Sequence, residues 1–325
     1  MKKNITLIAI TILFPALSFG QVFLETLEGD EITLNPIGIN NGAILGSLNS
    51  SEQSLQFKSV FTLPNKNGVL TNKFLTLSVK GKPSDGIATL FSGGNFNPST
   101  AINLSYSKIH LFSDKDKADS KFIDFFTLKA GYNINKQTLF KSDTSFKDQI
   151  NDFTFDGLDL SFNYNALLSG KNLLTFSIGY AQKNNYSKLD KVEIKDFSTI
   201  TDSLSGTTRE YSETVNGRMG NYKEYESFPL RIAYTNCPSE FKEDENKMKF
   251  GYTLYYSSEF GNITPSHNLG ALLFLTKQSE KTGIRTPVIG LGIQANDISD
   301  NLNKGNNLTK RITFNLTTIF NLTSL

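Results

Sequence analysis

Hydrophobic and polar residues alternate along most of this chain with a period of two, and the pattern is clearest in residues 310–322. There Phe314 and Leu316 fall on one side of an extended chain, while Thr313 and Asn315 fall on the other. A period of two is that of a β-strand. The alternating segments are longer than the roughly 5–6 residues of an average soluble strand.

The same alternation predicts about twelve strands, although ten or fourteen remain alternatives because the first two segments alternate least clearly. The expected strands are 38–49, 55–63, 71–80, 100–112, 121–134, 152–165, 171–183, 226–236, 246–258, 267–278, 286–297 and 310–322. One of them breaks the rule, since Leu272, Leu273, Phe274 and Leu275 are apolar on both faces. For that segment we expect either a β-bulge or a lumen partly filled with side chains.

The connections between the strands differ in length according to the end at which they fall. The long connections 81–99, 135–151 and 184–225 all fall at one end, as the outer loops of bacterial barrels do. Residues 184–225 are too many for a simple loop and contain two alternating pieces, so we expect a hairpin that rises beyond the membrane. It is interpreted either as a binding or gating loop or as a variable surface loop.

The first residues have the features of an export signal. Lys2 and Lys3 precede an apolar stretch at 5–17, and small residues flank Phe19 just before Gln21. The stretch is too short to cross a bilayer, so residues 1–20 are predicted to be a cleaved signal peptide. We expect residues 21–37 to form a periplasmic tail or a short plug. Residues 38–325 are expected to form a β-barrel that includes the long outer loop 184–225.

Composition narrows the class of protein further. Without the two signal lysines the chain has 31 basic and 31 acidic residues, which leaves no electrostatic basis for binding nucleic acid. The single cysteine, Cys237, excludes an internal disulfide framework. No helix-length apolar run follows the signal, so any membrane span must consist of strands.

The two faces of the strands differ in chemistry. The less apolar face is dominated by Gly, Ser, Thr, Ala and Asn, which suit the wall of a barrel lumen. Tyrosines near strand ends (Tyr132, Tyr164, Tyr180, Tyr234) are expected in an interfacial aromatic girdle. A soluble β-sandwich or jelly roll with the same alternation is the alternative fold.

The junction at 18–21, the alternating strands and the 310–322 segment resemble those of Gram-negative outer-membrane β-barrel proteins as an architecture class. The resemblance implies an all-β, antiparallel, up-and-down transmembrane β-barrel in the cell outer membrane. It also implies outer-membrane lipid and the outer-membrane assembly machinery as partners. The oligomeric state is left open.

Motifs that would indicate catalysis or metal binding are few. Ser266 and His267 are adjacent, so on a strand their side chains point to opposite faces and form a poor catalytic pair. Asp114, Asp116 and Asp119 only loosely resemble a calcium loop. We therefore expect no catalytic residues, no cofactor and no metal, and a protein that is not an enzyme.

Three functions are compatible with this pattern. The first is a small pore or uptake channel for small solutes, in which charged residues face the lumen. The candidates are Lys129, Asp159, Arg231, Lys249 and Arg311, with the four basic residues opposing Asp159 across the lumen. The second is a non-conducting structural or assembly barrel with a filled lumen. The third is a secreted soluble β-domain for adhesion or glycan binding.

Overall fold

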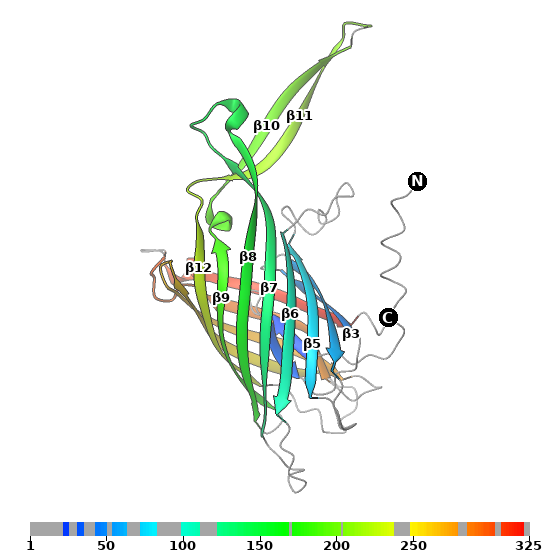
Figure 1. Cartoon of the computed structure of the whole chain (residues 1–325), viewed down its shortest axis with the longest axis vertical. Helices are drawn as coiled ribbons and strands as arrows, with labels where there is room; N and C mark the ends of the chain where they lie inside the picture. Colours follow the sequence, from blue (N-terminus) through cyan, green and yellow to red (C-terminus); the bar gives the residue numbers. More distant parts are fainter. Residues whose placement is uncertain are drawn as a thin grey trace.

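The computed structural model describes residues 22–25, 31–35, 43–50, 54–63, 72–82, 99–110, 122–168, 171–202, 204–236, 248–278, 285–302 and 307–321. Its main feature is one large antiparallel sheet that closes on itself (Figure 1). The predicted signal peptide, Cys237 and the three aspartates at 114–119 lie outside the described residues. Within the described residues, no helix is long and apolar enough to cross a bilayer.

Twelve strands form the closed ring, as the alternation predicted. They are β3 (Ala43–Asn49), β4 (Ser54–Thr62), β5 (Lys73–Lys82), β6 (Ser99–His110), β7 (Phe122–Phe140), β8 (Ile150–Leu168), β9 (Asn172–Asn184), β12 (Glu224–Asn236), β13 (Lys249–Gly261), β14 (Ser266–Gln278), β15 (Arg285–Ala295) and β16 (Ile312–Asn321). Each strand pairs antiparallel with its neighbour, and β16 pairs with β3 to close the ring. Closure leaves no exposed sheet edge in the wall and excludes the sandwich alternative.

Two further pairs of strands lie outside the ring. The hairpin of β10 (Asp190–Thr201) and β11 (Thr208–Met219) projects beyond one end of the barrel, which we call the outer end (Figure 1). The hairpin of β1 (Val22–Glu25) and β2 (Glu31–Asn35) contacts β15 and β16. The expectation of a tail or plug at 21–37 remains a prediction.

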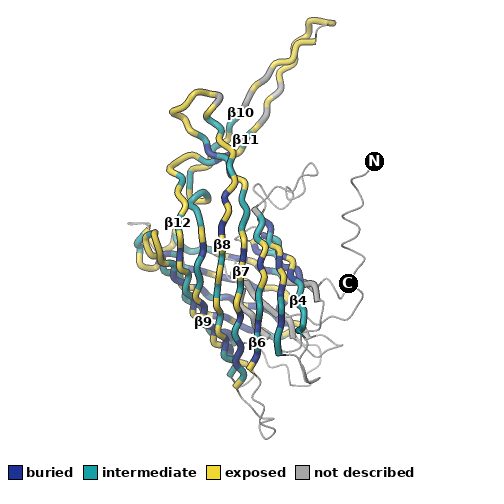
Figure 2. Tube along the Cα trace, in the orientation of Figure 1, coloured by how far each residue is buried: buried dark blue, intermediate teal, exposed yellow. Residues whose placement is uncertain are grey.

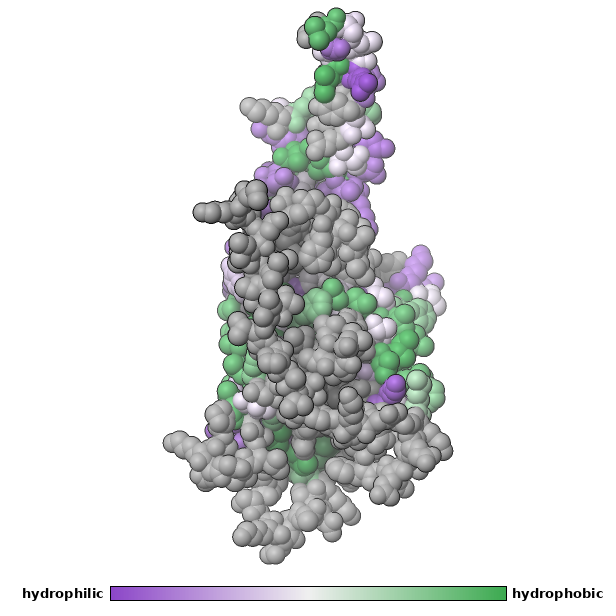
Figure 3. Space-filling view, turned by 90° about the vertical axis from the view of Figure 1, so that its right-hand side faces the viewer, coloured by the Kyte–Doolittle hydropathy of each residue, from purple (hydrophilic) through white to green (hydrophobic). Residues whose placement is uncertain are grey.

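Buried and exposed residues alternate along the strands (Figure 2), and the more exposed positions on the outer face are mainly apolar. Outward side chains such as Ile178, Ile232 and Leu254 are about half exposed, and Phe314 is 72% exposed. Figure 3 shows hydrophobic side chains gathered over the barrel, and mostly hydrophilic ones with a few hydrophobic ones on the projecting hairpin. This distribution is the one expected of a barrel whose wall meets lipid.

Aromatic side chains form pairs at two levels of the outer face. Near the inner end the ring of Tyr234 lies 6.1 Å from that of Tyr252. Near the outer end the ring of Tyr180 lies 5.7 Å from that of Phe228. On β12 the two levels are six residue steps apart, from Phe228 to Tyr234, or about 20 Å along the strand at roughly 3.3 Å per step. Two such girdles flank the apolar band of membrane barrels.

The expected irregularity in 267–278 is present in both forms. The register between β14 and β15 shifts between Leu275 and Thr276. In addition, Leu272 and Phe274 point into the lumen and are only 1% exposed. A bulge and a filled lumen therefore occur together on this strand.

The lumen-facing apolar side chains meet in the inner half of the barrel and form what we call the apolar septum. Every member is at most 3% exposed. They are Val60, Phe74, Ile109, Phe125, Leu173, Ala233, Tyr255, Leu272 and Phe274. Removing each large side chain from water contributes about 1.5–3 kcal/mol, so the septum is a substantial core inside the barrel.

Candidate functional site

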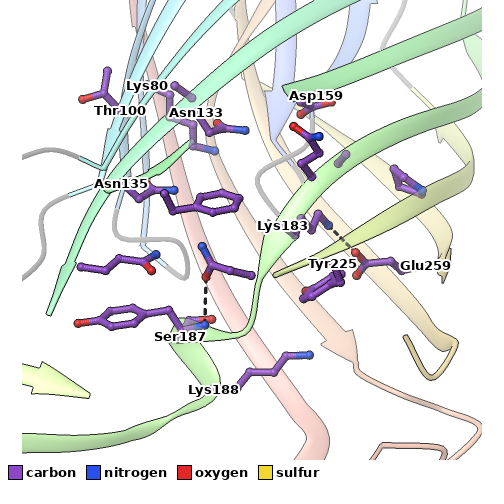
Figure 4. A pocket seen from close by; sticks show the side chains of 18 of the residues that line it. Lys80, Thr100, Asn133, Asn135, Asp159, Lys183, Ser187, Lys188, Tyr225 and Glu259 are labelled. Carbon is purple, nitrogen blue, oxygen red and sulfur yellow. Dashed lines mark hydrogen bonds and ion pairs between the residues drawn. The ribbon is translucent and has the colours of Figure 1, made fainter. Parts of the chain in front are cut away.

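The outer half of the lumen is a polar cavity of about 1820 Å³, which we call the outer chamber. Strands β5 to β9 and β12 to β16 line it, together with the base of the β10–β11 hairpin. The lining side chains are mainly Asn, Gln, Ser, Thr and Lys (Figure 4). Lumen-facing polar side chains on β3 and β4, such as Ser47 and Gln56, are instead buried outside the chamber.

The floor of the outer chamber lies directly against the septum on five consecutive strands of the ring, β7, β8, β9, β12 and β13. On each strand, the first side chain that lines the chamber stands two residues from an apolar side chain of the septum or packed against it. The pairs are Thr127 and Phe125 on β7, Asn165 and Leu167 on β8, Thr175 and Leu173 on β9, Arg231 and Ala233 on β12, and Ser257 and Tyr255 on β13. We call Thr127, Asn165, Thr175, Arg231 and Ser257 the floor ring.

Aromatic rings in the septum pack over lumen-facing glycines of the adjacent strand. The ring of Tyr255 on β13 occupies the space that a Cβ at Gly270 on β14 would need. The ring of Phe274 on β14 does the same at Gly251 on β13. Large aromatic rings fit inside this wall because glycine leaves room for them, and they shield the glycine backbone in return.

Charged side chains in the outer chamber are mostly basic. In the described part of the wall, eight lining residues are basic and four are acidic, a net excess of four positive charges. The basic residues are Lys80, Lys129, Lys136, Lys183, Lys188, Lys191, Arg218 and Arg231, and the acidic residues are Asp152, Asp159, Glu193 and Glu259. Two ion pairs join members of the two sets. Lys129 Nζ lies 3.4 Å from Asp159 Oδ2, and Lys183 Nζ lies 2.8 Å from Glu259 Oε1, the second pair being shown in Figure 4.

Three of the five charged residues predicted from sequence meet at this site. Lys129, Asp159 and Arg231 line the outer chamber, and Arg231 belongs to the floor ring with 7% of its surface exposed. Asp159 is not opposed to the basic residues across the lumen, because it bonds Lys129 on the neighbouring strand. Its carboxylate therefore neutralises the positive charge of Lys129 on the same side of the lumen.

The other two predicted residues lie elsewhere along the barrel axis. Lys249 begins β13 at the inner end, so the septum separates it from the chamber. Arg311 lies at the outer end of β16, where it donates to the carbonyl oxygen of Asp297 and approaches Asp300 Oδ1 at 3.4 Å. Both residues occupy positions that the alternation assigns to the lumen side, but neither lines the outer chamber.

The mouth of the chamber is held in place by the base of the β10–β11 hairpin. The hydroxyl of Tyr186 donates to the carbonyl of Thr138 at 2.9 Å and accepts from its amide at 3.2 Å. Arg218 lies over the Tyr186 ring at 5.7 Å and donates to the carbonyl of Leu189 at 2.6 Å. Burial and a hydrogen bond to Glu224 raise the pKa of Tyr222 beside this base, which keeps its hydroxyl neutral.

The two histidines lie on the outer face at opposite ends of the barrel. His110 bonds Asp124 at 2.9 Å near the inner end. His267, near the outer end, is within 2.9 Å of Ser258 Oγ and stacks on Tyr256. Ser258 is 3% exposed and also donates to the Ser266 carbonyl, so the geometry is that of a packed rim residue.

The described residues contain no group of three or more His, Cys, Asp or Glu side chains placed to hold a metal ion.

Most of the septum was not predicted from the sequence. Phe125 and Leu173 occupy the inward, mainly polar positions of their strands, so each stands next to an outward apolar neighbour. Such apolar doublets near the inner strand ends are the signal that indicates the septum. The prediction of a filled lumen rested on the doublets of 267–278 alone.

No family model matches this chain, and no curated protein matches it. Among solved structures, the NanC porin aligns over 86% of this chain and 97% of its own, with 8% sequence identity and a TM-score of 0.35. A likeness at this TM-score supports no inference. The fold is established instead by the pairing of the strands into a closed ring. The closed twelve-stranded ring with an apolar outer face has the architecture of outer-membrane β-barrel proteins.

Proposed function

We propose that this protein resides in the outer membrane and acts as a small pore or uptake channel for small polar solutes. The apolar outer face, the two aromatic levels and the predicted signal peptide support the location. The observation that carries the function is the outer chamber, a polar cavity of about 1820 Å³ bordered by the mouth at the β10–β11 hairpin.

The size of the chamber supports small solutes as the cargo. A water molecule takes up about 30 Å³ of liquid volume, so the chamber has room for roughly 60 waters. Small-ligand pockets typically measure about 300–1,000 Å³. The chamber therefore accommodates one small hydrated molecule with its water shell and excludes a folded macromolecule.

The septum determines how a solute would leave the chamber. Hydrophobic constrictions can close a pore by expelling water from it. Since septum members such as Leu272 and Phe274 are 1% exposed, the described side chains leave no wetted path beside them. We infer that uptake requires the septum to rearrange and that the barrel conducts weakly at rest.

Liposome swelling with a small neutral sugar tests this function. Wild-type protein should give slow swelling, and the double variant Leu272→Ala with Phe274→Ala should give clearly faster swelling because it opens the septum. Swelling of neither folded protein would refute the channel. A heat-modifiable band on a gel, together with recovery in the outer-membrane fraction, checks folding and location. Recovery in the soluble fraction would refute the location.

A second function, a non-conducting barrel that contacts other molecules, is favoured by the septum and by the hairpin. Phe197, Ile200 and Leu204 near the hairpin tip are 73%, 60% and 97% exposed. Exposed apolar side chains of this size often mark contact surfaces. Absence of swelling in both the wild type and the septum variant is the outcome that selects this function.

A further inference from the structure

We propose that the outer chamber selects small anions, such as solutes that carry carboxylate or phosphate groups, over cations. The inference rests on the proposed function, because it names the class of solute that the same chamber admits. It is carried by the charge of the lining at three levels: the mouth, the middle of the wall and the floor.

At the mouth the described lining is basic. Lys136, Lys188, Lys191 and Arg218 line the chamber there, with Asp152 and Glu193 as the acidic residues. Asp152 Oδ1 accepts the Thr138 hydroxyl at 2.5 Å, and Glu193 Oε1 lies 3.4 Å from Lys195, a cation that is not part of the lining. A solute that enters therefore meets an excess of positive charge.

In the middle of the wall the acidic residues are matched by bases. Asp159 is 3.4 Å from Lys129, and Glu259 is 2.8 Å from Lys183. Both pairs join positions on the lumen wall, so each carboxylate is compensated locally. A cation would have to compete with a lysine for either carboxylate.

On the floor the only charge among the five described positions of the ring is that of Arg231. Its neighbours on the flanking strands are Ser177 and Ser257, which offer hydroxyl groups to the same ligand. Its guanidinium has donors in a planar arrangement that matches carboxylate or phosphate oxygens. With 7% of its surface exposed, it is held against the septum, where the effective dielectric is lower than in water.

The three levels act together on a charged solute. A cleft lined by one sign of charge and walled by material of low dielectric concentrates the field and raises the local concentration of counter-ions. The effect must weaken with salt, because the Debye length falls from about 30 Å at 0.01 M to about 3 Å at 1 M. An anion is therefore attracted at the mouth and meets Arg231 where the polar chamber ends.

The test is isothermal titration calorimetry of the folded full-length chain in neutral detergent at low salt. Citrate and spermidine serve as probes, because they have similar sizes and charges of opposite sign. Citrate should bind saturably, spermidine should not, and high salt should abolish the citrate signal. Equal or tighter binding of spermidine would overturn the proposal.

Matched variants locate the effect. Lys188→Glu with Lys191→Glu removes the net positive charge of the described lining and should weaken citrate binding about tenfold. Lys141→Glu with Lys223→Glu changes the total charge equally at exposed positions outside the lining, and should leave binding within about twofold. Equal weakening by both pairs would show a general surface effect and refute the chamber as the site.

The floor is tested with Arg231→Gln and Arg231→Lys. The first should weaken citrate binding, and the second should retain most of it if charge at the floor matters. Because calorimetry needs no conduction, citrate binding without swelling would refute the channel and leave anion selection standing. Swelling without citrate binding would do the reverse.

Discussion

The hydroxyl of Tyr255 donates a 2.6 Å hydrogen bond to Oε1 of Gln294, although the two residues lie on strands that are not neighbours. Between them runs β14, where Gly270 pairs with both positions. The tyrosine ring crosses above this glycine, so one side chain links β13, β14 and β15 at the junction of the septum and the outer chamber. This bond makes the septum a defined structure and not merely a collection of apolar groups.

Gly270→Ala should destabilise the barrel, because the new Cβ occupies space now filled by the Tyr255 ring. Either the ring moves and the bond to Gln294 is lost, or the strands shift. We expect a loss of about 1–3 kcal/mol in the free energy of unfolding. Urea unfolding of the folded protein in lipid vesicles measures it. Gly290→Ala is the control, since its nearest neighbour would be Leu272 Cδ1 at 3.3 Å, the end of a flexible side chain. Equal losses in the two variants would contradict the close approach.

Ile178→Arg should destabilise the protein in membranes, because Ile178 is 48% exposed on the outer face between the two aromatic levels. Arginine on the lipid face near the midplane costs about 2–4 kcal/mol. Asn163→Arg is the matched control, as Asn163 lies opposite Ser177 on the lumen side of the neighbouring strand. Unfolding in vesicles should show a large loss for the first variant and a small change for the second. The reverse order would invalidate the assignment of the faces.

Tyr186→Phe should loosen the projecting hairpin and leave the barrel folded. The change removes both hydrogen bonds to the Thr138 backbone but keeps the ring beneath Arg218. Each bond is worth about 0.5–1.5 kcal/mol, which suffices to increase local opening. Hydrogen exchange at the Thr138 amide and protease cleavage within 190–219 should both accelerate. Tyr222→Phe is the control, because the Tyr222 hydroxyl donates to Glu224 at 3.0 Å and not to the Thr138 backbone. Unchanged exchange at Thr138 would refute the anchoring role.

The turn at the hairpin tip should withstand mild acid. Asp202 accepts hydrogen bonds from the Ser205 hydroxyl at 2.6 Å and the Leu204 amide at 3.0 Å, and these bonds lower its pKa. A lowered pKa means that the carboxylate stabilises the turn fully above its ordinary pKa of about 3.9 and loses this effect as the pH falls through the lower, folded value. Exchange protection of the Leu204 amide relative to unfolded peptide should therefore persist from pH 7 to about 4 and fall below that. Asp202→Asn should remove this pH dependence, and a loss of protection already near pH 5 would contradict it.

The alternation predicts which face of the sheet each residue occupies, but not its position along the barrel axis. Lys129, Lys249 and Arg311 all have the inward phase, yet only Lys129 lines the chamber. Height depends on register and strand tilt, which arise from pairings between strands that no single segment encodes. The twelve strands and the pairing of the last with the first were predictable for the opposite reason. The strands need only a period of two, and the pairing of the last with the first follows from closing the sheet so that no edge is left.

The septum was partly hidden for a related reason. Phe125 stands beside Phe126 and Leu173 beside Leu174, so each doublet looks like a strand end with an extra apolar residue. Only when several strands are aligned do the inward members of these doublets meet at one level. Arg231 gave no sequence signal of its position in the floor ring, because that position depends on its neighbours across the lumen.

The seam between β3 and β16 has a consequence for how the barrel assembles. Within the described residues it pairs Leu45–Asn49 with residues of β16, whereas β7 and β8 pair along all 19 residues of each. Apart from β9 with β12, every other pair of strands in the wall is consecutive in the chain and can form as a local hairpin. The seam alone joins the two ends of the barrel sequence, so we expect it to carry the largest loop-closure cost and to form last. Among the described residues the shortest pairing in the wall is thus the one expected to form last, and it is there that an unfinished barrel would be open to a neighbouring strand.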